Sequence, residues 1–360
     1  MDLAYCRARL SDSFARMAGR RVLLTGGAGF LGYYLVQAML EWNRHVLRSR
    51  AIAVTVVDNY VRGVPTWLAR LSDDWGRLTE HDVTKPLPVE LGDFDYFVHA
   101  ASIASPTFYR QFPIATMDAN VSGLRLLLEH VRGQQDRGQG VSGLLFFSSS
   151  EIYGDAEPHA IPTPETYPGR VSSIGPRACY DESKRYGETI CVNFARQYGL
   201  PVTIVRPFNN YGPGLKITDR RVIPDFARDV LNGADIVVHS DGSPTRTFCY
   251  IADAVVGYFK VLVQGRPGEV YNIGSEGPEV TIDDLAGRIA RAGNQLFGYS
   301  GRVIRQTSSD AEYLTDNPRR RCPDINKART ELDFSPDIDL DEGLRRTLLW
   351  YADNREEQIA

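Results

Sequence analysis

The chain has 360 residues, of which 43% are hydrophobic and 24% are charged, a composition ordinary for a soluble globular enzyme. A formal net charge of −4 gives no electrostatic reason to expect nucleic acid or an anionic membrane surface as a partner. No apolar run approaches the roughly 20 residues that span a bilayer. Five widely spaced cysteines without CxxC spacing, and six histidines without ligand spacing, predict reduced thiols in a cytoplasmic protein and no metal site.

The predicted elements alternate in type through the first two-thirds of the chain. An amphipathic helix is expected over residues 1–17, ahead of the first strand. Strands are then expected at 21–27, 51–58, 95–101, 141–149 and 201–207, and helices at 31–42, 114–131 and 180–198. Strands that are apolar on both faces and separated by helices predict an α/β fold, a Rossmann-like doubly wound parallel sheet. Ligands of such a sheet lie at the carboxyl ends of its strands.

The regular alternation ends near residue 207, where Gly- and Pro-rich turns begin to separate shorter elements. At this length, one large and one smaller lobe are the natural expectation. We expect a Rossmann domain over 18–207 together with about 235–275. The remaining segments, 208–234 and 276–350, are expected to form a smaller C-terminal lobe that covers the substrate.

A glycine-rich turn, TGGAGFLG, joins the first predicted strand to the first long helix. Gly26, Gly29 and Gly32 stand where a tight turn, close backbone approach to a pyrophosphate and close helix packing require glycine. The next strand ends in Asp58, which suits a hydrogen bond from an adenosine ribose hydroxyl. An acid there favours NAD over NADP, although Arg62 lies close enough in sequence to weaken that preference.

A tyrosine and a lysine four positions apart, Tyr180 and Lys184, open the helix predicted at 180–198, so they share one face. A lysine ammonium beside a phenol, with a positively charged nicotinamide nearby, is expected to lower the pKa of Tyr180 toward the working pH. The resulting phenolate could take the proton of a sugar hydroxyl. Another strand ends in FFSSSEIYGD, which would place the hydroxyls of residues 148–150 and the carboxylate of Glu151 beside this pair.

Taken together, these motifs resemble the extended short-chain dehydrogenase/reductase family of sugar-nucleotide epimerases, dehydratases and decarboxylases. The resemblance extends over nearly the whole chain after residue 17, through TGGAGFLG, VVDN, HAAS, SSSEIYGD, GPRACYDESKR, RPFNNYGPG, TRTFCYIADA and YNIG. Within that family the chain is most similar to the UDP-glucuronate decarboxylases, or UDP-xylose synthases, which share the glutamate after the serines, GPRACYDESKR and RCPDI. It departs from them at Ser149, where threonine is usual, and at Ile103, where proline is usual.

The resemblance implies roles for five catalytic residues. Tyr180 is expected to be the base, Lys184 its electrostatic partner, and Ser149 a donor to the C4 oxygen of the sugar. Glu151 is expected near the sugar carboxylate, where it would help to expel it or manage protonation at C5. Arg246 is expected to orient the substrate and hold the developing enolate. Oxidation at C4 gives a β-keto acid that loses carbon dioxide, and the ketone is then reduced with regeneration of NAD.

Further residues are expected to bind the two ligands, NAD and a nucleotide sugar, with a UDP-sugar favoured. The expected NAD contacts are Gly26, Gly29, Phe30, Leu31, Gly32, Asp58, Asn59, Asp82, Val83, Ala100, Ala101, Ser102, Asn120, Tyr180 and Lys184. The expected substrate contacts are Ser150, Asn209, Arg221, Arg246, Tyr250 and Arg321. The family also forms a four-helix dimer interface, which predicts a homodimer through the helices at 114–131 and 180–198.

Three alternative functions remain open from the sequence: a 4,6-dehydratase or a 4-epimerase of a nucleotide sugar, and a non-catalytic NAD-binding regulator. Glu151 is the discriminating residue among the enzymes, because glucose dehydratases usually carry Asp-Glu there and epimerases a small residue or serine. Intact Ser149, Tyr180 and Lys184 favour an enzyme over a regulator.

Overall fold

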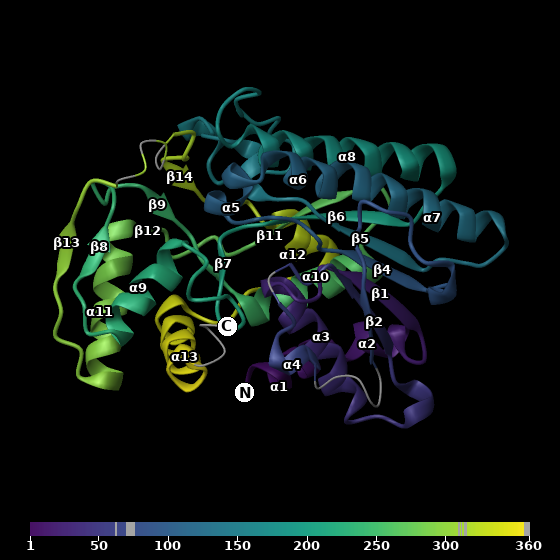
Figure 1. Cartoon of the computed structure of the whole chain (residues 1–360), viewed down its shortest axis with the longest axis horizontal. Coiled ribbons are helices and arrows are strands. Elements are labelled where there is room, and N and C mark those ends of the chain that lie inside the picture. The colour runs from purple at the N-terminus through teal and green to yellow at the C-terminus, as the bar shows by residue number, and fades with distance from the viewer. Residues whose placement is uncertain (62, 70–75, 309, 311, 313–314, 356–360) are drawn as a thin grey trace.

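Seven parallel strands form the main sheet, with the spatial order β11-β6-β5-β4-β1-β2-β3 (Figure 1). The computed structural model describes residues 1–61, 63–69, 76–308, 310, 312 and 315–355. The strands are β1 (Arg21–Thr25), β2 (Ala53–Asp58), β3 (Gly76–Glu80), β4 (Tyr96–His99), β5 (Gly143–Phe147), β6 (Val202–Pro207) and β11 (Val270–Ile273). The strand order reverses between β1 and β4, which is where a doubly wound sheet binds its ligand. The predicted α/β class and parallel sheet are confirmed.

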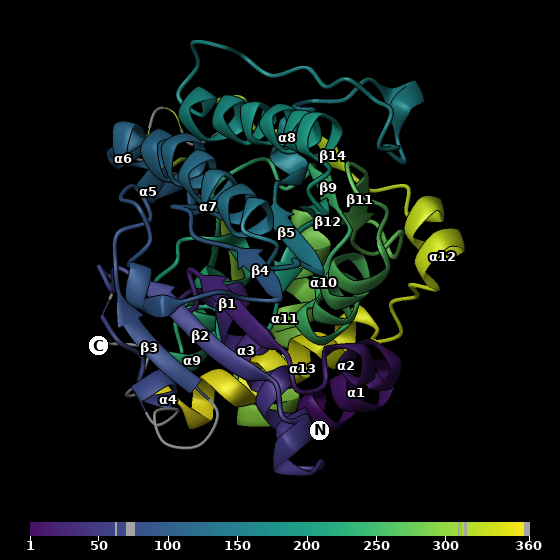
Figure 2. The same ribbon diagram turned by 90° about the vertical axis from the view of Figure 1, so that its right-hand side faces the viewer.

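Helices cover both faces of this sheet (Figure 2). On one face lie α3 (Phe30–Asn43) and α10 (Ile251–Gln264). On the other lie α5 (Pro106–Gln111), α6 (Pro113–Met117), a π-helical turn (Asp118–Gly123), α7 (Leu124–Asp136) and α8 (Ala178–Tyr198). The short elements are α4 (Thr66–Ala69) and the 3₁₀ turns Arg48–Arg50, Val89–Leu91, Ser150–Tyr153 and Pro158–Ala160. The inner strands are mostly apolar because both of their faces are buried by these helices, whereas the edge strand β3 is polar and partly exposed.

The N-terminal segment contains two helices, α1 (Asp2–Arg9) and α2 (Ser11–Met17), where a single helix was expected. The chain turns at Leu10, whose φ of −108° and ψ of 9° interrupt the helical path. Both helices pack on α10, and α1 also packs on α3. Four apolar side chains of this segment are fully covered and belong to the core on that face: Cys6, Leu10, Phe14 and Met17.

A smaller lobe lies beside the carboxyl ends of the main strands (Figure 1). Its helices are α9 (Val222–Leu231), α11 (Ile282–Phe297) and α13 (Leu340–Asp353), while α12 (Asn326–Leu332) packs on α10 and β11. Its short strands are β7 (Asn210–Tyr211), β8 (Ile236–Val238), β9 (Thr245–Arg246), β10 (Cys249–Tyr250), β12 (Val280–Thr281), β13 (Val303–Arg305) and β14 (Arg320–Arg321). None of the described helices combines the length and the apolar character needed to cross a bilayer.

The predicted division of the chain needs one correction. Residues 235–250 were assigned to the Rossmann domain, yet β8 pairs with β13, and β9 pairs with β12 and β14. The chain returns to the Rossmann domain only at α10, which begins at Ile251. It then rejoins the main sheet as β11. The turn-rich composition of 239–245 hid this boundary, because it gives no sign of which sheet the neighbouring short strands join.

Candidate active site

A cavity of about 1140 Å³ opens between the carboxyl ends of the main strands and the smaller lobe. Its wall includes every residue assigned above to catalysis, NAD or substrate, with the exception of Asn120 and Tyr250. Residues far apart in sequence therefore meet in one space, as the resemblance implies. Arg62, the residue expected to weaken the NAD preference, lies outside the described residues.

The glycine-rich turn leads from β1 into α3 and requires glycine at two of its positions for steric reasons. Gly26 has a φ of +76°, and a Cβ added there would lie 2.5 Å from the backbone nitrogen of Ala101. A Cβ on Gly32 would lie 2.4 Å from the carbonyl oxygen of Gly27. The turn thus brings the N-terminus of α3, with its unpaired backbone N–H groups, to the cavity as an anion site.

Asp58 ends β2 at the same edge and is oriented by the backbone. Its carboxylate accepts hydrogen bonds from the N–H of Ala28 and of Tyr60, both at 3.0 Å. Burial raises the pKa of this carboxyl above its usual value, and the backbone donors oppose that shift. The acid is fixed beside the glycine-rich turn, which is the placement that a ribose hydroxyl requires.

Tyr180 and Lys184 lie on one face of α8, next to the end of β5. The ammonium nitrogen of Lys184 lies 5.7 Å from the centroid of the Tyr180 ring and donates a hydrogen bond of 2.8 Å to the carbonyl oxygen of Phe147. Ser149 begins the following turn, and its Oγ accepts from the backbone N–H of Glu151 at 3.1 Å. The predicted base, its cationic partner and a hydroxyl are therefore brought together.

The charge state of this pair differs from the expectation. Burial raises the pKa of Tyr180 to about 12, and the hydrogen bond with Ser149 only partly offsets that rise. Burial also lowers the pKa of Lys184 to about 7. The predicted fall in the tyrosine pKa is therefore wrong for the protein by itself, because removal from water disfavours both charged forms. The nicotinamide charge on which that prediction depended is a property of the bound cofactor.

A buried ion pair between Glu188 and Arg206 helps to hold the serine-rich end of β5 in place. The Ser148 hydroxyl donates to Oε1 of Glu188 at 2.5 Å. Arg206, at the end of β6, donates to both oxygens of that carboxylate at 2.8 and 2.6 Å. Because Glu188 stands one helical turn after Lys184 on α8, this network fixes the helix to the two strands that carry the site.

Glu151 faces the cavity and is paired with two arginines. Arg321 donates to its two oxygens at 2.8 and 2.7 Å, and Arg177 donates to Oε2 at 2.7 Å. Burial acts to raise the pKa of this carboxyl, but Arg177 and Arg321 outweigh it and hold the pKa at about 2. Glu151 is therefore a permanent negative charge in the wall of the cavity.

Arg246 lines the same region with a different set of partners. Its hydrogen-bond acceptors among the described residues are neutral oxygens, on Thr245, Arg319, Pro318 and Asn317, at 2.5 to 3.2 Å. Burial, and then the nearby Arg321, lower the pKa of its guanidinium to about 9. Arg246 still carries a proton at neutral pH, so it offers a buried positive charge to an anionic ligand.

Two further predicted substrate residues line the cavity from the smaller lobe. Asn209 donates through Nδ2 to the carbonyl oxygen of Thr247 at 2.8 Å, and its Oδ1 lies 3.4 Å from an Arg321 nitrogen. Arg221, ahead of α9, forms an ion pair of 2.7 Å with Asp219. Both residues stay candidates for contacts with the nucleotide part of a substrate.

Three residues near the site were not predicted from the sequence. The ring of Tyr109, on α5, stacks on Tyr180 with centroids 4.9 Å apart and planes 11° apart. Arg177 holds Glu151, and Asp181 is buried beside them, where burial and Glu151 raise the pKa of its carboxyl to about 8. Arg177 and Asp181 lie within the quoted GPRACYDESKR stretch, so proximity to Tyr180 was an available signal. Nothing local indicates Tyr109.

Asn120 and Tyr250 need correction, because neither residue lies in the wall of the cavity. Asn120 lies in the π-helical turn and donates to the Ser183 hydroxyl at 2.9 Å, which ties that turn to α8. The Tyr250 hydroxyl donates to Asp2 at 2.6 Å, under the N-terminal helix α1. No local feature of the sequence indicates that α1 covers Tyr250.

Comparison with known proteins identifies the family to which this chain belongs. Residues 22–274 match the NAD dependent epimerase/dehydratase family. The chain belongs to this family. It is 37% identical to UDP-glucuronic acid decarboxylase 3 of Arabidopsis thaliana over 325 residues, which cover 90% of this chain and 86% of that protein. It is 36% identical to UDP-glucuronic acid decarboxylase 1 of Xenopus tropicalis over 343 residues, or 94% and 74% of the two chains.

Solved structures of other family members share the fold. UDP-glucose 4-epimerase of Thermotoga maritima, solved with UDP-glucose, superimposes with a TM-score of 0.78 at 26% identity, over 93% of this chain and 99% of that one. The dTDP-glucose 4,6-dehydratase DesIV of Streptomyces venezuelae, solved with NAD bound, gives a TM-score of 0.79 at 28% identity, over 93% and 98%. The fold and the family thus agree, and this family member is an enzyme.

NAD is the cofactor of this family, and the residues present fit it. The turn at Gly26 leaves a space beside Ala101 that a Cβ would fill, next to the open N-terminus of α3. Asp58 is held by backbone donors where the adenosine ribose of a dinucleotide lies in a Rossmann domain. These residues would hold the dinucleotide across the switch point of the sheet.

Proposed function

We propose that this enzyme converts UDP-glucuronate to UDP-xylose and carbon dioxide, with NAD regenerated in each cycle. The observation that carries the proposal is the pairing of a permanently ionised Glu151 with Arg177 and Arg321, beside Arg246, whose acceptors in the described part of the chain are neutral. The relatives from Arabidopsis thaliana and Xenopus tropicalis, named UDP-glucuronic acid decarboxylases, support the same substrate.

In the proposed reaction, Tyr180 is the residue that transfers the proton. NAD, when bound, supplies the acceptor for the hydride of sugar C4 and the donor that returns it. Tyr180 takes the proton of the C4 hydroxyl, and Ser149 donates a hydrogen bond to the same oxygen. Lys184, fixed by the Phe147 carbonyl, offers the cationic partner that lets the phenol lose its proton. Tyr109 stacks against the phenol ring and restricts its tilt.

Glu151 and Arg246 act on the carboxylate of the sugar. A ketone at C4 lies β to that carboxylate. The bond between the carboxylate carbon and C5 therefore breaks, with its electrons moving into the C4 carbonyl. A fixed negative charge near the sugar carboxylate favours its departure as neutral carbon dioxide. Arg246 holds the anionic substrate and then the enolate. A carboxyl with a pKa of about 2 is a poor proton donor at neutral pH, so the role of Glu151 is electrostatic, and the enolate takes the proton at C5 from solvent water before the hydride returns to C4.

The direct test is to incubate NAD-loaded protein with UDP-glucuronate and analyse the nucleotide sugar and the gas released. A UDP-pentose formed together with carbon dioxide supports the proposal. Tyr180→Phe should lower turnover by about 10²- to 10⁴-fold while NAD stays bound. A 4-keto-6-deoxy sugar formed from a nucleotide hexose, or a 4-epimer of the uronic acid, would instead identify a dehydratase or an epimerase.

We also propose that two copies of the chain associate through α6, α7 and α8, which share one outer face of the molecule (Figure 2). Large apolar side chains are exposed on α6 and α8: Ile114 is 68% exposed, Met117 43% and Tyr186 51%. Apolar side chains in such positions favour burial against a second copy. We further propose a cytoplasmic location, which is supported by the five free cysteines.

A further inference from the structure

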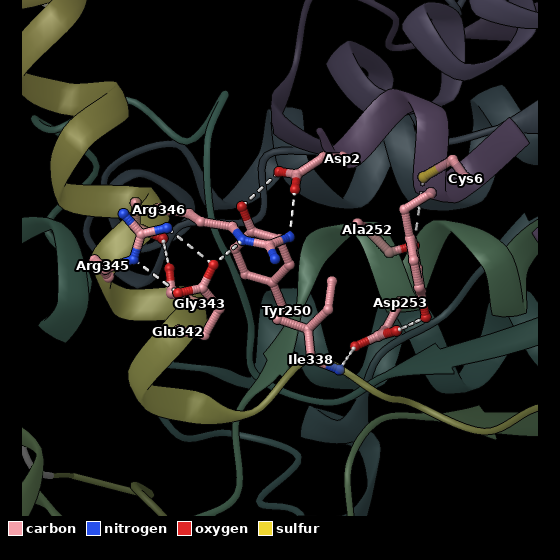
Figure 3. Close-up of polar contacts among 12 residues, drawn as sticks. Asp2, Cys6, Tyr250, Ala252, Asp253, Ile338, Glu342, Gly343, Arg345 and Arg346 are labelled. Carbon is pink, nitrogen blue, oxygen red and sulfur yellow. Dashed lines mark hydrogen bonds and ion pairs between the residues drawn. The ribbon is translucent and has the colours of Figure 1, made fainter. Parts of the chain in front are cut away.

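Asp2, on α1, joins three elements that are distant in sequence, and Figure 3 shows its contacts with Tyr250 and Arg346. Its Oδ1 accepts a hydrogen bond from Arg346, on α13, at 2.7 Å. Its Oδ2 accepts from the Tyr34 hydroxyl, on α3, at 2.8 Å and from the Tyr250 hydroxyl at 2.6 Å. The carboxylate and the Arg346 guanidinium are mostly buried, at 14% and 19% exposed, so this ion pair is less screened than a surface pair.

The helix that carries Asp2 is itself fixed to the Rossmann domain. Tyr5 donates to the Asp253 carboxylate at 2.5 Å, and that carboxylate also accepts the backbone N–H of Ile338 at 2.9 Å (Figure 3). The following helix α2 is fixed to α10 as well, where the Phe14 ring packs edge-on against Phe259 with centroids 4.9 Å apart. Asp2 therefore projects from a fixed support, and its hydrogen bonds constrain α13 relative to α3.

The same two helices meet again at the cavity, through the residues next to those that Asp2 contacts. Trp350 stands one helical turn after Arg346 on α13, and Tyr33 precedes Tyr34 on α3. The Tyr33 ring lies 6.2 Å from Trp350 and 4.8 Å from Trp67, measured between ring centroids. Trp67 and Trp350 both line the cavity.

These three aromatic residues lie on the dinucleotide side of the cavity. Tyr33 is on the helix whose N-terminus faces the cofactor, and Trp67 is on the segment that follows Asp58. Trp350 belongs to the smaller lobe. The lobe therefore reaches over the dinucleotide half of the cavity at this point, and its position there depends on how α13 is held.

We propose that Asp2 is a positioning residue that holds α13 against α3, keeps Trp350 packed beside Tyr33 and Trp67, and so slows the release of NAD. An enzyme that regenerates its cofactor in every cycle gains from retaining it. The inference goes beyond the proposed function, because NAD release is measured without a sugar and does not depend on which substrate is turned over.

The test is the dissociation rate of NAD from the NAD-loaded full-length protein, followed after removal of free NAD. Asp2→Asn should raise the rate about fivefold or more, as expected for the loss of one charge-assisted contact. Asp12→Asn removes the same charge from an exposed position on α2 and should leave the rate unchanged. Arg346→Gln should match Asp2→Asn, and the double variant should add little to either.

Gln134→Ala separates positioning from general stability. It removes two buried hydrogen bonds between α7 and the backbone of Phe94, on the face of the sheet opposite to α1, so it should lower the melting temperature without changing the NAD rate. Unchanged NAD release in a folded Asp2→Asn protein would overturn the inference. Faster release in Asp12→Asn or Gln134→Ala, to the same extent as in Asp2→Asn, would also overturn it, since the effect would then follow charge or stability alone.

Discussion

Arg321 donates to both carboxylate oxygens of Glu151, at 2.8 and 2.7 Å, across 170 positions of sequence. The contact joins the smaller lobe to the turn after β5. The Glu151 carboxylate is therefore held in this ion pair only while the smaller lobe contacts that turn. Arg177 adds a second donor from the residue before α8. The two guanidinium groups hold the carboxylate in one orientation, so its negative charge keeps a fixed place in the cavity wall.

Replacing Arg321 by lysine should lower turnover of UDP-glucuronate by about 10²-fold. The lysine keeps the charge but loses the paired donors, so Glu151 is no longer held in one orientation. Steady-state kinetics measure the loss. Arg320→Lys is the matched control, because Arg320 makes the same two-pronged contact with Glu279 on the exposed side of β14. Equal losses in the two variants would contradict a specific role for Arg321.

Lys184 predicts a pH dependence of stability for the protein free of dinucleotide. Burial lowers the pKa of Lys184 to about 7, whereas an unfolded lysine titrates near about 10.4. Between these values the unfolded chain binds the extra proton, so the contribution of Lys184 to stability rises with pH. The melting temperature of the natural protein should therefore rise relative to that of Lys184→Met between pH 7 and pH 10. A constant difference over this range would show that Lys184 keeps an ordinary pKa.

Gly26→Ala should abolish NAD binding. The added Cβ would lie 2.5 Å from the Ala101 nitrogen, in a backbone conformation that alanine rarely adopts. Gly138→Ala is the matched control, since Gly138 has a similar φ of +78° and nothing within 4 Å of a Cβ. Both variants should lose about 1 kcal/mol of stability through strain alone. The NAD content of the purified proteins, measured after denaturation, separates them, and equal NAD content would refute the steric role of Gly26.

The parts of the fold and site that the sequence predicted are those encoded by neighbouring residues. The glycine spacing before α3, the acid at the end of β2 and the Tyr180–Lys184 pair are all local, and the structure brings them together as expected. Tyr109 was missed because its stacking on Tyr180 joins two helices about 70 positions apart. Tyr250 was misplaced because its partner, Asp2, lies 248 positions away. The raised pKa of Tyr180 depends on burial that only the folded chain produces.

Met117→Glu should convert the proposed dimer to single chains of 40.2 kDa. Met117 ends α6 and is 43% exposed on the face that α6 shares with α8. A glutamate there would have to be buried without a partner, which costs more than most interfaces of modest size can offset. Light scattering at micromolar concentration measures the mass. Leu47→Glu is the control, because Leu47 is exposed beyond the end of α3, which covers the opposite face of the sheet. A natural protein that scatters as a single chain, or a Met117→Glu variant that stays at twice that mass, would rule out this interface.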